Sequence, residues 1–97
     1  MPKYISLIKW TQQGIENVKE SPNRYEAFKK LCKSLGAKVD AVYLTMGRYD
    51  LVVIVDAPDS EVIAKIMLTT GSKGSTTTET LQAFTEEQYR KILAALP

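Results

Sequence analysis

The feature that most restricts the fold of this chain is a pair of predicted strands that are apolar on both faces. Residues 51–57, LVVIVDA, are dominated by β-branched side chains on either face. Residues 3–10, KYISLIKW, also place large apolar side chains on both alternating faces. A strand of this kind needs cover on both sides. We therefore expect a sheet that is packed between two layers.

Two segments have the periodicity of amphipathic helices. The first starts with Ser21 as a predicted N-cap and Pro22 at the first helical position, and it ends at Gly36. The second follows Asp59, a predicted N-cap, and is broken by residues 71–75, GSKGS. The apolar stripes contain Tyr25, Phe28, Leu31, Cys32 and Leu35 in the first helix, and Val62, Ile63, Ile66 and Met67 in the second.

The remaining elements complete a regular order. Residues 37–46 and 76–84 read as strands, Gly47 predicts a tight hairpin, and Thr11 caps a short helical turn. Thr85 to Gln88, TEEQ, is a capping box that opens a C-terminal helix. Strand 37–46 is expected to alternate Val39, Ala41 and Tyr43 against Val42, Leu44 and Met46. The apolar side chains of the last helix are expected to point inward: Tyr89, Ile92, Leu93 and Leu96.

The order β-α-β-β-α-β-α predicts an α+β fold, a ferredoxin-like βαββαβ sandwich with a C-terminal helix that spans residues 1–97 as one domain. In this fold the strands form an antiparallel sheet of order 4-1-3-2, and both crossover helices lie on one face. The other face stays apolar and uncovered, and such a patch usually marks an interface. We expect two copies to pair through it as a homodimer.

The composition excludes several classes of function. Without histidine and with a single cysteine, Cys32, the chain cannot form a catalytic triad or an ordinary zinc site, so we expect no metal and no other cofactor. We expect Cys32 to be a small buried side chain. A net charge of +2 does not indicate nucleic acid or an anionic membrane as a partner, and residues 51–57 lack the aromatic side chains of RNA-binding sheets. With no long apolar segment, we expect a cytoplasmic protein.

Side chains able to bind a ligand gather at one end of the predicted sheet. The strand order brings together residues 9–14 (KWTQQG), 47–50 (GRYD) and 71–74 (GSKG). Binding residues often lie on such loops, so we predict a ligand-binding rim there. Its members are Lys9, Trp10, Arg48, Tyr49 and Asp50.

Structural roles compete with this interpretation. Gly47 is expected to supply a positive φ, and Arg48 to be solvated. Asp50 is expected to accept backbone N–H groups of its own turn or to pair with a nearby Lys or Arg. We expect Trp10 to lie in the core or at an interface. Tyr49 is expected equally at an interface or in a pocket. The GSKG segment is not a phosphate loop, because it follows a helix and precedes a strand.

Three stretches carry a resemblance to a known family: 47-GRYDLVVIVDAPD-59, the opening 4-YISLIKWTQQG-14 and the tail 81-LQAFTEEQYRKI-92. Together they resemble the GYD-domain family, named for a Gly-Tyr-Asp signature that here contains the additional Arg48. The resemblance implies a ferredoxin-like subunit of a dimeric α/β barrel and implies little about activity. More distantly, YDLVVIVDAPD is similar to the effector-binding domain of leucine-responsive and AsnC-type regulators. Their DNA-binding helix-turn-helix has no counterpart in this sequence.

Three classes of function remain open. The first is a homo-oligomeric small-ligand-binding or scaffold-type domain without catalytic residues. The second is a small cofactor-free enzyme, monooxygenase- or isomerase-like, in which Asp50 would need a raised pKa to move a proton. The third is an effector-sensing subunit similar to the regulators. A closed apolar pocket containing Tyr49 and Asp50 would favour the enzyme or the sensor, whereas engagement of these side chains in loop hydrogen bonds would favour the scaffold.

Overall fold

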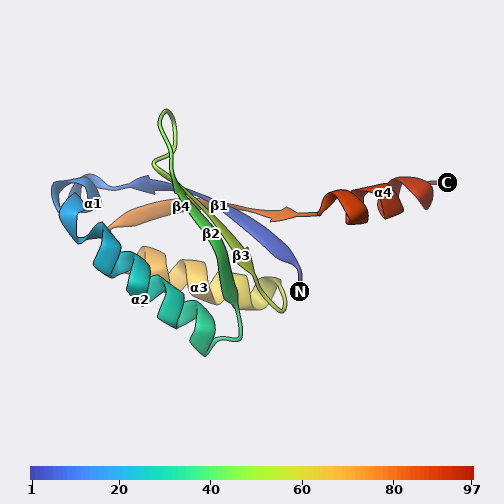
Figure 1. Cartoon of the computed structure of the whole chain (residues 1–97). Coiled ribbons are helices and arrows are strands. Elements are labelled where there is room, and N and C mark those ends of the chain that lie inside the picture. Colours follow the sequence, from blue (N-terminus) through green and yellow to red (C-terminus); the bar gives the residue numbers. More distant parts are fainter.

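The computed structural model covers residues 1–97 and has the predicted order of elements (Figure 1). The strands are β1 (Lys3–Trp10), β2 (Lys38–Leu44), β3 (Leu51–Asp56) and β4 (Thr76–Ala83). The helices are α1 (Gln12–Glu16), the 3₁₀ helix η1 (Val18–Glu20), α2 (Ser21–Ser34), α3 (Ser60–Ser72) and α4 (Glu86–Ala94). All strand pairs are antiparallel and the order is β2-β3-β1-β4, which confirms the predicted ferredoxin-like α+β topology.

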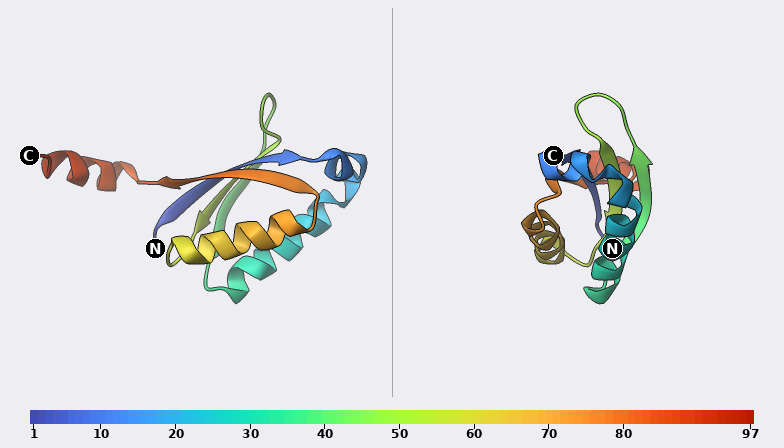
Figure 2. Two further views of the ribbon diagram at one scale, coloured as in Figure 1. Left: turned by 180° about the vertical axis from the view of Figure 1, so that it is seen from behind. Right: turned by 90° about the vertical axis from the view of Figure 1, so that its left-hand side faces the viewer.

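Helices α2 and α3 lie on the same face of the sheet, which we call the covered face (Figure 2). The hydrophobic core lies between this face and the two helices, and it consists of Tyr4, Ile8, Phe28, Cys32, Ala37, Val53, Val55, Ala57, Ile63 and Ile66. Ser6 is also buried there, and its hydroxyl group lies 2.9 Å from the Thr80 hydroxyl. Cys32 is fully buried as predicted, and burial raises the pKa of its thiol to about 11.

Local sequence signals set most helix ends as predicted. The side chains of Thr11 and Asp59 accept the N–H groups of Gly14 and Val62, and Thr85 and Gln88 form the full capping box. Gly36 ends α2 with a φ of 78°. The prediction for Ser21 was wrong in detail: it is the first residue of α2, because η1 leads directly into the helix.

The connection between β2 and β3 is longer than the predicted tight hairpin. It contains residues 45–50 and is closed by hydrogen bonds from the Thr45 N–H to the Asp50 carbonyl (2.8 Å) and from the Thr45 hydroxyl to the Tyr49 carbonyl (2.7 Å). Gly47 adopts the predicted positive φ, 109°. The longer loop stands above the end of the sheet (Figure 1).

A β-bulge between Val39 and Ala41 corrects the predicted faces of β2. The extra residue, Asp40, reverses the alternation. Val39 therefore pairs with Val55 and shares the covered face with Val42, whereas Ala41 lies on the opposite face.

The opposite face, which we call the open face, has no cover from its own chain (Figure 2). Residues that pair across antiparallel strands share a face, and the strand registers assign these large apolar side chains to it: Ile5, Leu7, Tyr43, Val52, Ile54 and Leu81. Tyr43 exposes 58% and Leu81 47% of its surface. Two crossover helices thus cover one face of the sheet, as predicted, and leave an apolar face in solvent.

Helix α4 projects away from the rest of the molecule at the end of β4 (Figure 1). We call residues 84–97 the C-terminal arm; every one of them is exposed. The expectation that its apolar residues point inward was wrong for the single chain: Tyr89, Ile92, Leu93 and Leu96 are 44% to 61% exposed. The reason is that β4 carries the chain beyond the edge of the core before the helix starts.

Candidate functional site

The three loops predicted to meet at one end of the sheet do meet. The Thr11 N–H donates to the Ser75 carbonyl (3.0 Å), and the Thr11 hydroxyl donates to the Gly74 carbonyl (2.5 Å). On the other side of β1, the Asp50 N–H donates to the Ile8 carbonyl (2.8 Å). The segments after β1, before β3 and before β4 are therefore joined by main-chain hydrogen bonds.

Asp50 is used to hold this junction together. Its carboxylate accepts the N–H of Trp10 at 2.9 Å. The backbone group that it satisfies belongs to the neighbouring strand β1 rather than to its own turn, which was the expected partner. Asp50 thus fixes the end of β1 and with it the position of Trp10.

Three other predicted rim residues gather in a shallow depression of about 240 Å³ beside the open face: Lys9, Arg48 and Tyr49. The Tyr49 hydroxyl donates a hydrogen bond of 2.5 Å to the Glu79 carboxylate, and this bond raises the pKa of the Tyr49 phenol. Trp10 does not join this group, because it lines a different and larger cavity. The five predicted residues are neighbours at one end of the sheet but do not line one pocket.

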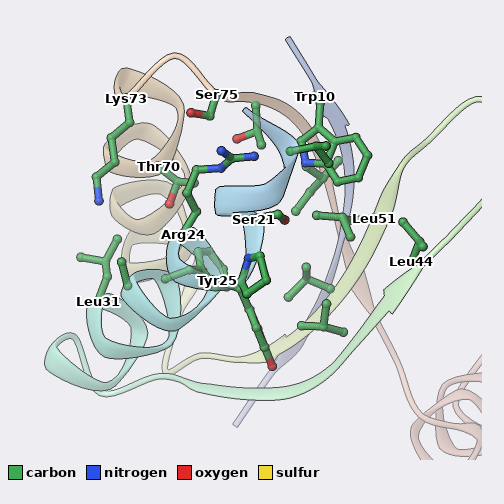
Figure 3. Close-up of a pocket in the computed structure, with 18 residues that line it drawn as sticks. Trp10, Ser21, Arg24, Tyr25, Leu31, Leu44, Leu51, Thr70, Lys73 and Ser75 are labelled. Carbon is green, nitrogen blue, oxygen red and sulfur yellow. The ribbon is translucent and has the colours of Figure 1, made fainter. Parts of the chain in front are cut away.

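The larger cavity lies between α2, the covered face and the C-terminal end of α3 (Figure 3), and we call it the helix-side cavity. Its volume is about 550 Å³. Apolar walls come from the sheet through Trp10 and Leu51 and from α2 through Tyr25 and Phe28. Sequence reasoning missed this cavity, because it depends on how far α2 stands from the sheet, and no local pattern encodes that distance.

The polar groups of the helix-side cavity come from Arg24, at the N-terminal end of α2, and from residues between α3 and β4. The Arg24 guanidinium donates to the carbonyls of Asn17 (2.9 Å) and Gly14 (3.2 Å), which holds it in place. Gly14 is itself required here, because a Cβ at this position would lie 2.0 Å from the Ser75 carbonyl oxygen. Thr76 contributes a buried hydroxyl oxygen that has no hydrogen-bond partner.

No three or more acidic or cysteine side chains gather in a way that could hold a metal ion. None of the helices is long and apolar enough to cross a membrane.

The fold and these two sites define a ferredoxin-like α+β domain with a cavity under one face of its sheet and an apolar surface on the other. Residues 4–93 match the family described as GYD domain. The chain belongs to the GYD-domain family, as its sequence resemblance indicated.

Relatives of this chain include proteins of known structure. A Thermus thermophilus protein named glutamine synthetase and cystathionine beta-lyase binding protein is 38% identical over 84 residues, which cover 86% of this chain and 88% of the relative. A solved structure of a protein from Thermus thermophilus is similar with a TM-score of 0.56 and 29% identity, over 88% of this chain and 95% of that one.

The leucine response regulatory protein of Mycobacterium tuberculosis is similar in fold. Its structure matches with a TM-score of 0.65 over 87% of this chain and 51% of the regulator. At 12% identity this likeness shows the fold alone.

Proposed function

We propose that this protein is a non-catalytic, self-associating binding subunit: two copies pair through their open faces, and each copy keeps a cavity for a small molecule on its covered face. The observation that carries the proposal is the apolar open face together with the projecting C-terminal arm. Both bear large exposed apolar side chains, and a monomeric protein rarely leaves such a surface in water.

The layout of the open face supports pairing. Its middle is apolar, and its two ends are polar: Lys3 bridges Asp56 (2.9 Å) and Asp40 (3.2 Å) at one end, and Tyr49 bonds Glu79 at the other. An apolar centre with a polar rim is the usual anatomy of a protein interface. A twofold axis would place the same surface of each copy against the other.

The C-terminal arm supports the same assembly. Helix α4 has nine residues, and an isolated helix of this length is marginal in water. Its polar side is held by ion pairs such as Arg90–Glu86 (3.1 Å), whereas Ile92 and Leu93 on its apolar side are half exposed. Packing against a second copy would cover this stripe and stabilise the helix.

The contacts of the predicted rim favour a scaffold role for the rim over a catalytic or sensing role. The Asp50 carboxylate is engaged with the Trp10 N–H, and the Tyr49 hydroxyl with Glu79. Neither side chain lines the helix-side cavity. A closed pocket containing both side chains would have favoured an enzyme or a sensor, and the helix-side cavity is not such a pocket.

A second candidate function is a docking subunit for metabolic enzymes. It is favoured by the Thermus thermophilus relative, which is named for binding glutamine synthetase and cystathionine beta-lyase. Sedimentation of this chain with each purified enzyme tests it: a faster-sedimenting complex supports docking, and independent boundaries at micromolar concentrations contradict it.

The first proposal is tested by placing a charge in the middle of the open face. Ile54→Lys would bury an ammonium group between the two copies, and we expect light scattering to change from dimer to monomer. Leu68→Lys is the matched control, because Leu68 is 75% exposed on α3, away from the open face. A dimer that survives Ile54→Lys, or one that Leu68→Lys dissociates equally, would contradict pairing through the open face.

A further inference from the structure

We propose that the helix-side cavity binds a small apolar molecule with a single carboxylate group, with the apolar part beside Trp10 and Phe28 and the carboxylate at Arg24. This inference rests on the proposed binding function, because it names the ligand class of that site. It does not rest on self-association, because the cavity lies on the other side of the sheet from the open face.

The size and walls of the cavity fit a small organic ligand. Its volume of about 550 Å³ lies within the usual range of ligand pockets, ~300–1,000 Å³. Most of the side chains around it are apolar, and they come mainly from three strands and from α2. In Figure 3, Trp10, Leu51 and Tyr25 surround the same space from the sheet and from α2. An apolar body would replace water along these walls and gain from the hydrophobic effect.

The charges of the cavity select an anion. Arg24 and Lys73 are its charged lining residues, and no carboxylate lines it. Neither side chain forms an ion pair within the chain. Arg24 uses only part of its five N–H donors on the Asn17 and Gly14 carbonyls, so donors remain for a ligand. A planar guanidinium held in place by two carbonyls is suited to a carboxylate.

A buried hydroxyl group provides a second, independent indication of a ligand. Thr76 lines the cavity, and its hydroxyl oxygen is shielded from solvent and has no hydrogen-bond partner in the protein. Buried polar groups are nearly always paired, so an unpaired hydroxyl on a cavity-lining residue indicates a polar partner that the protein itself does not supply. A polar atom of the ligand would supply it.

The protein contains its own reporter for a test. Trp10 is the single tryptophan and lines the cavity, so ligand binding should change its fluorescence. We propose titrations with octanoate and with octanol, which have the same chain length but differ in charge. Charge-assisted hydrogen bonding to Arg24 should make octanoate bind at least about tenfold more tightly than octanol. Equal affinities for the two probes would overturn the proposal.

Substitutions of the charged cavity residues test where the carboxylate group binds. Arg24→Met should abolish the preference for octanoate over octanol, and Arg24→Lys should keep part of the preference. Since Arg24 also holds α1, Lys73→Met is the second variant; its side chain makes no bond within the protein, and we expect a loss of about threefold, a typical exposed-charge effect. Lys30→Met, on the outer surface of α2, is the matched control and should change nothing.

The proposed dimer and the proposed ligand site can be refuted independently of each other. A monomer in light scattering that still prefers octanoate through Arg24 would refute pairing and support the cavity. A dimer in which octanoate binding depends on Ile54 rather than on Arg24 would place the probe on the open face and overturn this inference.

Discussion

The two faces of the sheet are built from alternating residues of the same strands, yet only one of them is buried by the chain itself. On the covered face, Val53 and Val55 are buried by helices of their own chain. On the open face, their neighbours Val52 and Ile54 are only partly buried. The difference arises because a βαββαβ chain supplies two crossover helices, and both lie on one side.

Stability and binding are expected to reside on different faces of the sheet. The covered face closes a hydrophobic core within one chain and retains a hollow at one end. The open face is not covered by its own chain. Its apolar side chains are removed from water only when another surface covers them.

Gly14→Ala should be the most damaging change to the covered side. The added Cβ would lie 2.0 Å from the Ser75 carbonyl oxygen, so α1 must move away and lose its bonds to the loop before β4. We expect a loss of about 3 kcal/mol or more in the free energy of unfolding, measured by urea denaturation.

The matched control is Gly71→Ala in α3. A Cβ at Gly71 meets nothing within 4 Å, and alanine favours a helix over glycine, so stability should hold or rise by up to ~1 kcal/mol. Equal effects of the two substitutions would show that the close approach at Gly14 is not what matters.

Val55→Ala and Val52→Ala compare the faces directly. Val55 is fully buried, and its truncation should cost about 2 kcal/mol at every protein concentration. If a second copy covers the open face, truncation of Val52 should remove contacts made mainly with that copy. Its cost should therefore be seen in the concentration dependence of thermal unfolding. A Val52→Ala variant whose melting temperature falls equally at all concentrations would break the distinction.

The smallest effect concerns Lys3, at the polar end of the open face. Hydrogen bonds to Asp56 and then Asp40 raise the pKa of the Lys3 ammonium. A raised folded-state pKa gives a stability contribution that is complete below the unfolded value, ~10.4, and is lost as pH rises through the folded value.

The stability difference between wild type and Lys3→Met should therefore be constant from neutral pH to about pH 9 and shrink above about pH 10.5. Denaturation by urea at several pH values measures it. Lys38→Met, which removes an exposed lysine that forms no ion pair, should give a difference without this pH dependence.

The sequence predicted those parts of the fold that depend on local signals. Helix ends followed from Thr11, Asp59 and the capping box at Thr85, and the strand order followed from the succession of elements. The meeting of the loops at one end of the sheet followed from that order.

Other features depend on packing and were not predictable. The bulge at Asp40 moves Val39 to the other face without a local signal. The separation of Trp10 from Tyr49 depends on which side of the sheet each side chain faces. In α4, the periodicity correctly indicated an apolar stripe but could not say whether its own chain or another would cover it.

The mass of the wild-type protein in solution shows directly whether two copies pair through the open face. Light scattering after size-exclusion chromatography, at loading concentrations from about 1 to 100 μM, reports that mass. If a second copy covers the open face, the mass at the highest concentration should be at least twice that of the chain. A protein with the mass of a single chain at the highest concentration would contradict the account.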